Sequence, residues 1–477
     1  MTKAIGSKSF TQADIDWFAM ASGDYNPVHV DSVAARRLIT GGTVVHGMRT
    51  LLWMLEQHFE VGGSGFSRLT AYFPRPVRPG EALQLRQSAI EGSGIRLELL
   101  RDGEMAAAVT LEGADVTPVC VEPVTGPPLR CAPDEHTFAA LRGRSGQTAV
   151  AWRSADIQSA FPFTVRRLGE VRVAAIMALS RLVGMQAPGL HSIFTGLTIA
   201  FDEDHVGQII NWQVSRASAP VAPIRLTVSG GGLSGHLDAI VRPAPVEQPH
   251  MSALEAMVTE GEFAGQRAMV VGGSRGLGEL VAKLIVAGGG ESTISYRAGE
   301  ADAQRIVSEI TSWGGNCSAI PLDVADPDAL APSLGRLQQS PTHVYYFPTP
   351  RIIKLAASGF DAKAFIQYAD IYVTAFDRLV LAMSEGRSEI LRIFYPSTSF
   401  IDELPQGFAE YAAAKAAGEV HCAYLNRTLK PVAIQARRLS RLGTDQTASL
   451  IPQTVGSTLD VMLEAARSLH NFAKPSE

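Results

Sequence analysis

The chain has 477 residues, of which 46% are hydrophobic and 19% are charged, and its formal net charge at pH 7 is −5. This length is too great for one hydrophobic core and indicates about three domains. The net charge is small, and the sequence shows no basic stripe with interleaved aromatic residues, so we expect no nucleic-acid partner.

The cysteine pattern and the first residues of the sequence give an expectation for the cellular compartment. The four cysteines are scattered, without a Cys-x-x-Cys pair or metal-ligand spacing, which indicates reduced thiols and no metal site. The first residues lack an apolar signal core, and no run reaches about 18 apolar residues. We therefore expect a cytoplasmic protein that does not bind a membrane.

The loop 23–29 reads Gly-Asp-Tyr-Asn-Pro-Val-His and carries the strongest chemical signal. Pro27 fixes its own φ and pushes Asn26 toward an extended backbone, so a tight bend can bring Asp24 and His29 together. A carboxylate and an imidazole can deprotonate a water and return a proton to carbon, which is what hydration of an activated double bond requires. An ordinary surface salt bridge is the alternative interpretation of the same pair.

An apolar helix is predicted over residues 46–59, and Gly62 and Gly63 end it. A helix this apolar should be wrapped by a sheet. The strands expected around it cover residues 69–73, 82–89, 95–101 and 106–112.

The block that opens this helix is Val45-His46-Gly47-Met48. Together with Ser22-Gly23-Asp24-x-Asn26-Pro27-x-His29, it resembles the MaoC-like (R)-specific enoyl-thioester hydratases, a hotdog-fold family. The resemblance implies a catalytic loop with Asp24, Asn26 and His29, in which Asp24 and His29 hold the catalytic water. It also implies that the Gly47 amide polarises the thioester carbonyl, as the positive end of a helix can. For His46 a structural role is favoured over that of a second acid or base.

An internal repeat follows. The pattern Phe66-x-x-Leu69-Thr70-x-x-Phe73 recurs as Phe194-x-x-Leu197-Thr198-x-x-Phe201, and Ala13-Asp14-Ile15 recurs as Ala155-Asp156-Ile157. The second copy is shorter and lacks the Asp–His loop. We infer a second, degenerate hotdog over about 130–242 with its helix near 174–185; chance similarity of short strand motifs is the alternative. Because hotdogs usually pair, the tandem would form a pseudo-dimer whose site faces a channel between the halves.

After a Pro-rich joint at 242–249, the pattern changes to alternating strands and helices. A strand at 268–271 precedes the glycine-rich stretch 272–278 and a helix over 279–287. This order makes a backbone cradle that can bring a pyrophosphate to a helix N-terminus. Asp323 follows a later strand, where a carboxylate can meet an adenine.

Residues 265–470 resemble the short-chain dehydrogenase/reductases through this stretch and Tyr411-x-x-x-Lys415. Lys415, one helical turn from Tyr411, is expected to lower the phenol pKa for proton transfer at a carbonyl. The family's serine position falls on Thr398, with neighbouring hydroxyls as alternatives. Arg275 and Arg297 could bind a 2′-phosphate, which favours NADP(H) over NAD; solvated arginines are the alternative. The implied cofactor-binding residues are Gly272, Ser274, Arg275, Gly276, Leu277, Gly278, Arg297, Asp323, Val324 and Thr444.

The sequence also departs from that family. The stretch 347–350 reads Phe-Pro-Thr-Pro where Asn-Asn-Ala-Gly is expected, and Tyr372 stands where the active-site Asn aligns. Leu439-Ser440 replaces a Pro-Gly pair near the nicotinamide. These changes favour cofactor binding over turnover.

The predicted architecture is an α+β double hotdog followed by an α/β Rossmann domain with a doubly wound parallel sheet. The expected parts are a catalytic hotdog (1–126), a degenerate hotdog (127–247), a linker (248–262) and a reductase domain (263–477). The predicted function is a bifunctional enzyme: an enoyl hydratase or 3-hydroxyacyl dehydratase joined to an NADP(H)-dependent 3-ketoacyl reductase. The expected substrate is an acyl thioester of coenzyme A or acyl carrier protein, and resemblance suggests a homo-oligomer. The alternatives are a hydratase with a non-turnover reductase-like scaffold, and a reductase with a hotdog acyl-binding module.

Overall fold

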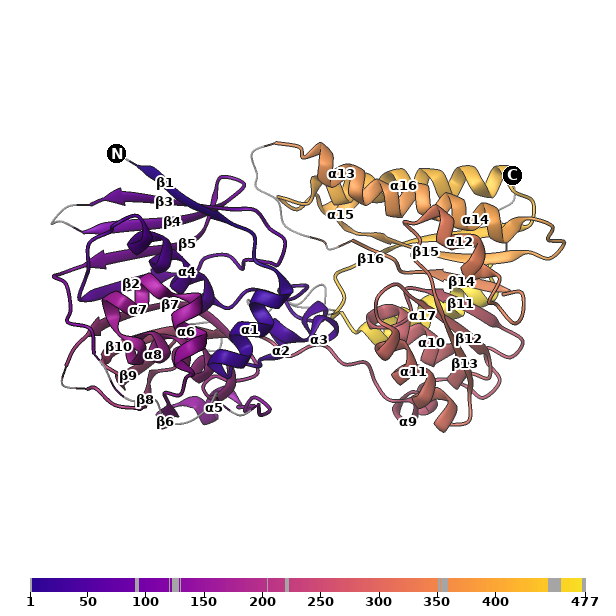
Figure 1. Cartoon of the computed structure of the whole chain (residues 1–477). Helices are drawn as coiled ribbons and strands as arrows, with labels where there is room; N and C mark the ends of the chain where they lie inside the picture. The colour runs from indigo at the N-terminus through magenta and orange to yellow at the C-terminus, as the bar shows by residue number, and fades with distance from the viewer. Residues whose placement is uncertain are drawn as a thin grey trace. The chain divides into compact units, whose positions relative to one another are not determined.

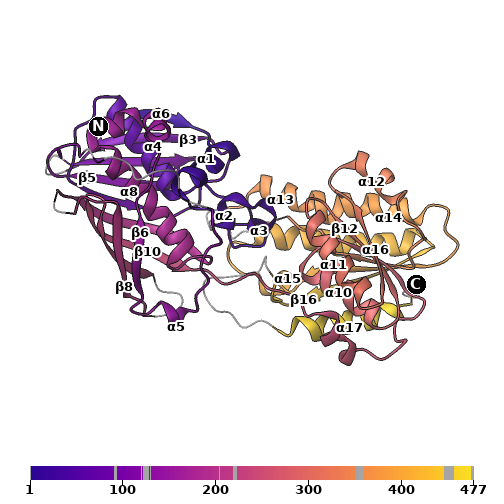
Figure 2. The same cartoon turned by 60° about the horizontal axis from the view of Figure 1, so that its bottom comes forward.

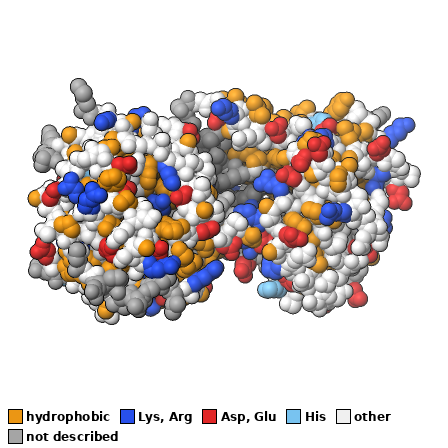
Figure 3. Space-filling view, viewed as in Figure 1, with side chains coloured by type: hydrophobic (Ala, Val, Ile, Leu, Met, Phe, Trp, Pro, Cys, Tyr) orange, Lys and Arg blue, Asp and Glu red, His pale blue; other side chains and the backbone are white. Residues whose placement is uncertain are grey.

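The computed structural model describes residues 2–90, 94–119, 121, 128, 130–203, 205–218, 223–350, 352, 359–444 and 456–473. The chain forms two compact units, Met1–Ala244 and Pro245–Glu477, each with its own β-sheet (Figure 1). On the face shown in Figure 3, acidic and basic side chains are interspersed over each unit. Among the helices of the described residues, none combines the length and the apolar character needed to cross a membrane.

The described part of the first unit contains a ten-stranded sheet in the order β1-β3-β4-β5-β2-β7-β10-β9-β8-β6, antiparallel at every pairing (Figure 1). The strands expected from the sequence are present, with ends shifted by at most two residues. The bounds are β1 (Lys3–Lys8), β2 (Arg68–Tyr72), β3 (Leu83–Ala89), β4 (Ile95–Arg101), β5 (Glu104–Glu112), β6 (Ser145–Ala149), β7 (Ser192–Phe201), β8 (Ile209–Arg216), β9 (Ile224–Gly230) and β10 (Leu233–Val241).

The sheet is built from two halves with the same strand order. The strands β6–β10 repeat the strand order of β1–β5. In each half the order from the outer edge of the sheet to its centre is first, third, fourth, fifth and second strand of that half. The halves meet where β2 pairs with β7, and there Thr70 lies directly opposite Thr198. Their hydroxyl oxygens are 3.3 Å apart. Because these threonines occupy the same position of the repeated motif, a local two-fold axis passes between them, and the repeated strand order agrees with the internal repeat in the sequence.

The helices of this unit gather on one face of the sheet, as the turned view shows (Figure 2). A single hydrophobic core runs through both halves, so they share one interior. The second central helix begins earlier than expected, at Glu170, and its last turn is π-helical, a form often found at functional sites. The helices are α1 (Gln12–Ser22), α2 (Pro27–Val30), α3 (Ser32–Arg36), α4 (Gly47–Glu60), α5 (Phe138–Leu141), α6 (Ser154–Ala160), α7 (Pro162–Leu168), α8 (Glu170–Arg181) and the π-helical turn η2 (Leu182–Gln186).

The described part of the second unit contains a six-stranded parallel sheet in the order β13-β12-β11-β14-β15-β16, which is the doubly wound order. Alternate residues of β11 enter two separate cores, Ala268 and Val270 on one face and Met269 and Val271 on the other. The predicted Rossmann-type sheet is therefore confirmed. The strands are β11 (Arg267–Val271), β12 (Glu291–Tyr296), β13 (Asn316–Pro321), β14 (His343–Tyr346), β15 (Leu391–Thr398) and β16 (Val432–Leu439).

The start of this unit differs from the expected linker. Met251 and Leu254 lie in the first core of the unit together with Phe263, so part of the segment 248–262 belongs to the packed domain. Burial of these apolar side chains stabilises a packed structure directly after the Pro-rich joint. The helices are α9 (Met251–Leu254), η3 (Glu255–Met257), α10 (Gly276–Ala287), α11 (Glu300–Ser312), α12 (Pro327–Leu334), α13 (Ala362–Ala369), η4 (Asp370–Ala375), α14 (Phe376–Ser384), α15 (Phe400–Glu403), α16 (Ala409–Thr428) and α17 (Thr458–His470).

Candidate active sites

The Asp–His loop of the first unit is a buried turn between two helices. Helix α1 ends at Gly23, which adopts a left-handed conformation with φ 79°. Asn26 then caps α2 by accepting a hydrogen bond from the Val28 amide, and Pro27 occupies the first helical position. Asp24 is only 1% exposed and Asn26 is fully buried. The alternative of a surface salt bridge is wrong, since both ends of the loop are shielded from solvent.

The loop brings Asp24 and His29 together, as the sequence predicted. Nδ1 of His29 lies 2.7 Å from the carbonyl oxygen of Val44, which requires a proton on that nitrogen. In neutral His29 the other nitrogen, Nε2, therefore carries a lone pair, and it faces Oδ2 of Asp24 at 3.9 Å. That separation is too long for a direct hydrogen bond and leaves each group able to contact one water.

His46 supports this pair from the start of helix α4. Its Nε2 donates to the backbone oxygen of Asp24 at 3.0 Å, and its ring stacks on His29 with centroids 3.7 Å apart. Its Nδ1 is buried without a hydrogen-bond partner among the described residues. These contacts fit the predicted structural role, because His46 fixes the loop and the ring of His29.

The second half of the unit contributes to the site, as the expected channel between the halves implied, but sequence reasoning missed the residues through which it does so. Ser180 of α8 donates a 2.7 Å hydrogen bond to Oδ2 of Asp24. The side-chain amide of Asn26 donates to the carbonyl oxygens of Gly184, Gly189 and Leu190 at 2.7, 3.3 and 3.3 Å. A Cβ atom on Gly184 would lie 2.3 Å from Oδ1 of Asp24, so any other residue there would displace the carboxylate. No sequence motif marks Ser180 or Gly184, and only the fold brings them to the loop.

Burial shapes the electrostatics of the site. Burial raises the pKa of Asp24, although His29 and the Ser180 hydrogen bond oppose the shift. Burial lowers the pKa of His29 and places that of His46 well below its ordinary value. Nearby, Arg242 is 2% exposed, donates to the Leu190 oxygen at 2.6 Å, and has its pKa lowered to about 10 by burial. At neutral pH the imidazole of His29 is therefore the uncharged form that can accept a proton.

Gly47 is the first residue of α4, as expected. Amides of the first helical turn have no acceptor within the helix, and they lie at its positive end. Phe73 packs beside this residue, with its ring 3.5 Å from where a Cβ of Gly47 would be. Phe73 in turn contacts Phe194 of the other half edge to face at 6.0 Å. The helix start thus offers a donor for an oxyanion next to an apolar surface.

Asp24, His29 and His46 could in principle hold a metal ion, because their potential ligand atoms lie within 4.8 Å of one another. The hydrogen bonding fits a metal poorly. Nε2 of His46 needs its proton for the bond to the Asp24 oxygen, and Oδ2 of Asp24 already accepts from Ser180. We derive no step from a metal here.

In the second unit, the glycine-rich loop joins β11 to helix α10. Gly272 has φ 75° and Gly276 has φ 60°, conformations that favour glycine. A Cβ atom on Gly278 would lie 2.5 Å from the Gly272 oxygen, so the turn is too tight for any side chain. The loop ends at a twelve-residue helix. These features fit a dinucleotide pyrophosphate, whose charge the helix N-terminus would stabilise.

The other predicted cofactor residues lie at the same carboxyl edge of the sheet. Arg297 is exposed just after β12, and Asp323 and Val324 follow β13. Asp323 accepts the Ala325 amide at 3.0 Å, which shapes its turn. Thr444 lies against the loop, 3.9 Å from a Cβ position on Gly276. Ser274 is 9% exposed, Arg275 stands at the N-cap position of α10, and Leu277 packs against the core.

The predicted catalytic groups of this unit come together only in part. The hydroxyl of Thr398, at the end of β15, hydrogen-bonds Tyr411 on α16, as the spacing predicted. Lys415 instead donates to the Pro396 oxygen at 2.6 Å and lies 3.8 Å from the centre of the Tyr372 ring. The expectation that Lys415 lowers the Tyr411 pKa is wrong, because burial raises that pKa to about 12. Burial also lowers the pKa of Lys415 to about 7.

The departures from the family pattern fill the space near these groups. Tyr372 is fully buried in the π-helical turn η4 and hydrogen-bonds Thr349 through its hydroxyl. Its ring packs edge to face on Tyr411, with centroids 5.9 Å apart. The backbone nitrogen of Pro348 lies 3.2 Å from a Cβ position on Gly272 and carries no hydrogen to donate.

Comparisons with known proteins agree with this division. The MaoC like domain family matches residues 3–99, and the KR domain family matches residues 267–357. The chain is 27% identical over 196 residues to the chloroplastic NADPH-dependent aldehyde reductase-like protein of Arabidopsis thaliana, covering 36% of this chain and 70% of that protein. A second such reductase from Arabidopsis thaliana, NADPH-dependent aldehyde reductase 2, is 25% identical over 207 residues, covering 37% of this chain and 72% of that protein.

Among solved structures, a short chain dehydrogenase from Burkholderia cenocepacia J2315 in complex with NADP is 24% identical. The match has a TM-score of 0.40 and covers 44% of this chain and 91% of that one. The family matches place a MaoC-like domain at the N-terminal end of this chain and a KR-type short-chain dehydrogenase/reductase domain in its C-terminal part.

Proposed function

We propose that the chain is a bifunctional acyl-thioester enzyme. Its first unit would be a tandem of two hotdog folds that interconverts a trans-2-enoyl thioester and its (R)-3-hydroxyacyl form. Its second unit would interconvert that hydroxyl and a 3-keto group with NADP(H). The observation that carries the proposal is the buried pair of His29 and Asp24, 3.9 Å apart, beside the start of helix α4.

The geometry supports each step of the proposed hydration. A water between Nε2 of His29 and Oδ2 of Asp24 gives a proton to neutral His29 as its oxygen attacks the β-carbon of the enoyl group. The electron pair of the double bond moves to the thioester oxygen, where the Gly47 amide stabilises the negative charge. The proton then returns to the α-carbon, so that one water has been added and His29 is neutral again. Dehydration is the reverse.

The second unit has the residues to hold NADP(H) and to move a proton. Bound NADPH supplies a hydride to a carbonyl carbon. The glycine-rich loop would hold the pyrophosphate, and Arg275 or Arg297 would bind the 2′-phosphate. Tyr411 would donate a proton to the carbonyl oxygen, with Thr398 positioning its hydroxyl. The NADPH named for the Arabidopsis relatives supports this cofactor.

The hydratase assignment is tested with crotonyl-coenzyme A as the enoyl thioester. We expect Asp24→Asn to abolish water addition, followed by loss of the enoyl absorbance, while NADPH binding persists. Asp31→Asn is the matched control, because Asp31 lies in the same region, is exposed, and caps helix α3. Undiminished hydration by Asp24→Asn would show that the site is wrongly assigned.

The second candidate is a hydratase whose reductase-like unit binds a cofactor without turnover. Lys415 favours this candidate, because it is held by the Pro396 oxygen and lies over the Tyr372 ring. Steady NADPH oxidation with acetoacetyl-coenzyme A, lost in Tyr411→Phe and kept in Tyr424→Phe, would eliminate it. Tyr424 is an exposed residue of the same helix α16. Absence of oxidation with a panel of 3-ketoacyl thioesters would support it.

A further inference from the structure

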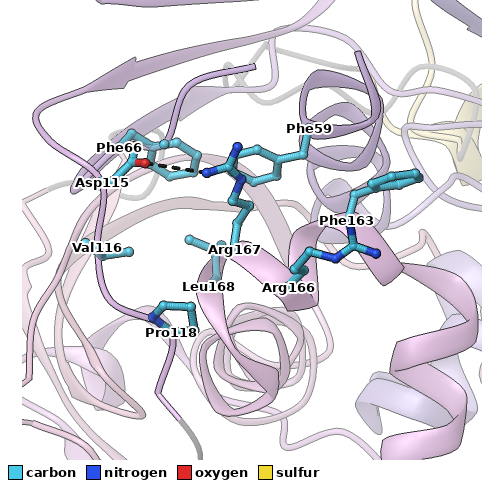
Figure 4. Close-up of a pocket in the computed structure, with 10 residues that line it drawn as sticks. Phe59, Phe66, Asp115, Val116, Pro118, Phe163, Arg166, Arg167 and Leu168 are labelled. Atoms are coloured by element: carbon cyan, nitrogen blue, oxygen red, sulfur yellow. Dashed lines mark hydrogen bonds and ion pairs between the residues drawn. The ribbon is translucent and has the colours of Figure 1, made fainter. Parts of the chain in front are cut away.

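A cavity lies in the first unit near the end of helix α4 (Figure 4), whereas the Asp24–His29 pair lies near the start of that helix. Its volume is about 430 Å³. Phe59 in its wall is twelve residues along α4 from Gly47, a distance of about 18 Å at 1.5 Å per residue. The cavity is therefore separate from the hydration site. Its lining residues are Phe59, Gly65, Phe66, Asp115, Val116, Pro118, Phe163, Arg166, Arg167 and Leu168.

The local two-fold axis between the two halves relates this cavity to the hydration site. The hydration site lies at the start of α4 and is closed by Ser180 and Gly184 near the end of α8. The cavity lies at the start of α8, where Leu168 precedes the cap, and is closed by Phe59 near the end of α4. Helix α7 follows α6 here as α2 follows α1, and both short helices begin with proline.

The counterpart site has lost the water-activating groups. Glu56 of α4 accepts hydrogen bonds from the amides of Phe163 and Thr164, each at 2.9 Å, and from the Thr164 hydroxyl at 2.7 Å. It therefore fixes the first turn of α7 where the other half carries its catalytic loop. The titratable side chains in the cavity wall are Asp115, Arg166 and Arg167. This set holds no imidazole, so the cavity is suited to binding and not to hydration.

Two arginines and three aromatic rings give the cavity its chemistry (Figure 4). The guanidinium of Arg167 lies 5.9 Å from the centre of the Phe59 ring, and Nη1 lies 3.5 Å from Oδ2 of Asp115. The guanidinium of Arg166 lies 5.6 Å from the centre of the Phe163 ring. The wall thus holds two cations and one carboxylate, of which Arg167 contacts Asp115 and Arg166 lies toward Phe163, so it has an excess of positive charge. Guanidinium groups match carboxylates and phosphates with two parallel hydrogen bonds.

We propose that this cavity is a non-catalytic binding site for a small organic anion. The carboxylate or phosphate head would bind Arg166 and Arg167, and an aromatic or aliphatic body would pack on Phe59, Phe66 and Phe163. The volume falls within the range of small-molecule sites. A duplicated half that lost its chemistry would thus have kept its pocket and changed its ligand.

The test is calorimetric titration of the full-length protein with 3-phenylpropionate, phenyl phosphate and the uncharged 3-phenylpropanol. The test variant is Arg166→Gln/Arg167→Gln. The matched control is Arg142→Gln, because Arg142 is also exposed and lies 5.9 Å from a phenylalanine ring, Phe138, outside the cavity. Asp24→Asn is titrated as well, which separates this cavity from the hydration site.

We expect at least one of the two anions to bind the wild type and Asp24→Asn equally. The double variant should bind it at least tenfold more weakly, Arg142→Gln should be unchanged, and the alcohol should bind at least tenfold more weakly than the anions. The tighter of the two anions identifies the preferred head group. Equal binding of alcohol and anions, undiminished binding by the double variant, or no binding to the wild type would each overturn the proposal. Crotonyl-coenzyme A hydration by the double variant, expected at the wild-type rate, confirms that it is folded.

Discussion

Ser180 donates a 2.7 Å hydrogen bond to Asp24, although the two residues are 156 positions apart and belong to different halves of the first unit. The half without the Asp–His loop thus supplies the donor that fixes the carboxylate of the other half. Asn26 is held from the same side through the Gly184 oxygen. Neither half alone contains a complete site, which is a physical reason for both halves to share one chain and one core.

The variant Ser180→Ala should lower the rate constant for hydration. A hydrogen bond to a charged group contributes about 1.5–3 kcal/mol, which corresponds to a loss of roughly tenfold to hundredfold. Ser180 also lowers the pKa of Asp24, so the acid limb of the pH–rate profile should move to higher pH in the variant. Steady-state kinetics of both proteins across pH would check this. Ser192→Ala, a change at a buried serine of strand β7, should leave both quantities unchanged.

The variant Gly184→Ala tests the close approach of the two halves. Its Cβ would lie 2.3 Å from Oδ1 of Asp24, so the carboxylate must move. Since a displacement of about 1 Å can cost roughly a hundredfold in rate, we expect kcat to fall at least about tenfold. Gly42→Ala is the control, because a Cβ there would meet nothing within 4 Å. Equal rates for the two variants would contradict the predicted contact.

The pH dependence of hydration follows from the two pKa shifts. Burial raises the pKa of Asp24 above its ordinary 3.8 and lowers that of His29 below its ordinary 6.5. The reaction needs ionised Asp24 and neutral His29, so protonation of either group stops it. Because burial raises the pKa of Asp24, the acid limb of kcat/KM should have its midpoint above pH 3.8. An acid limb centred at or below pH 3.8 would contradict the requirement for ionised Asp24.

Much of the fold could be predicted because it depends on local patterns. The apolar helix that became α4, its flanking strands and the strand–loop–helix at 268–287 follow from period and turn residues. The repeat predicted the pseudo-symmetry, since Thr70 and Thr198 occupy equivalent motif positions and pair with each other. The Asp24–His29 pair was predictable because one proline-containing turn places both side chains.

Contacts between distant segments could not be predicted in the same way. Ser180 lies in an apolar helix where no motif marks it, and only the fold brings it to Asp24. The direction in which the Lys415 side chain points could not be predicted either. Its spacing from Tyr411 places the two on one helix face, but the Pro396 oxygen and the Tyr372 ring decide where the ammonium lies. The pKa of Tyr411 then follows burial instead of the expected cation.

Removal of metal ions should leave hydration unaffected. Two of the three groups that could ligate an ion are held by hydrogen bonds, because Nε2 of His46 donates to the Asp24 oxygen and Oδ2 of Asp24 accepts from Ser180. Crotonyl-coenzyme A hydration after dialysis against EDTA should equal the untreated rate, and added Zn²⁺ should not raise it. Loss of activity on dialysis with recovery on Zn²⁺ addition would contradict the proton-transfer role of His29.

The buried Lys415 should make the stability of the second unit depend on pH. Lys415 is 5% exposed, and burial lowers its pKa from 10.5 to about 7. As the pH falls from 10.5 toward 7, the unfolded chain takes up a proton that the folded chain does not, so folding stability is lost; below pH 7 both are protonated and the loss is complete. The slope is at most about 1.4 kcal/mol per pH unit. Denaturant titrations should show that the stability of the wild type relative to Lys415→Met rises from pH 7 to pH 10. The control is Lys363→Met, a change at an exposed lysine, which should show no such trend. If the stability of the wild type relative to Lys415→Met fell as the pH rose, the folded protein would instead stabilise the charged form of Lys415.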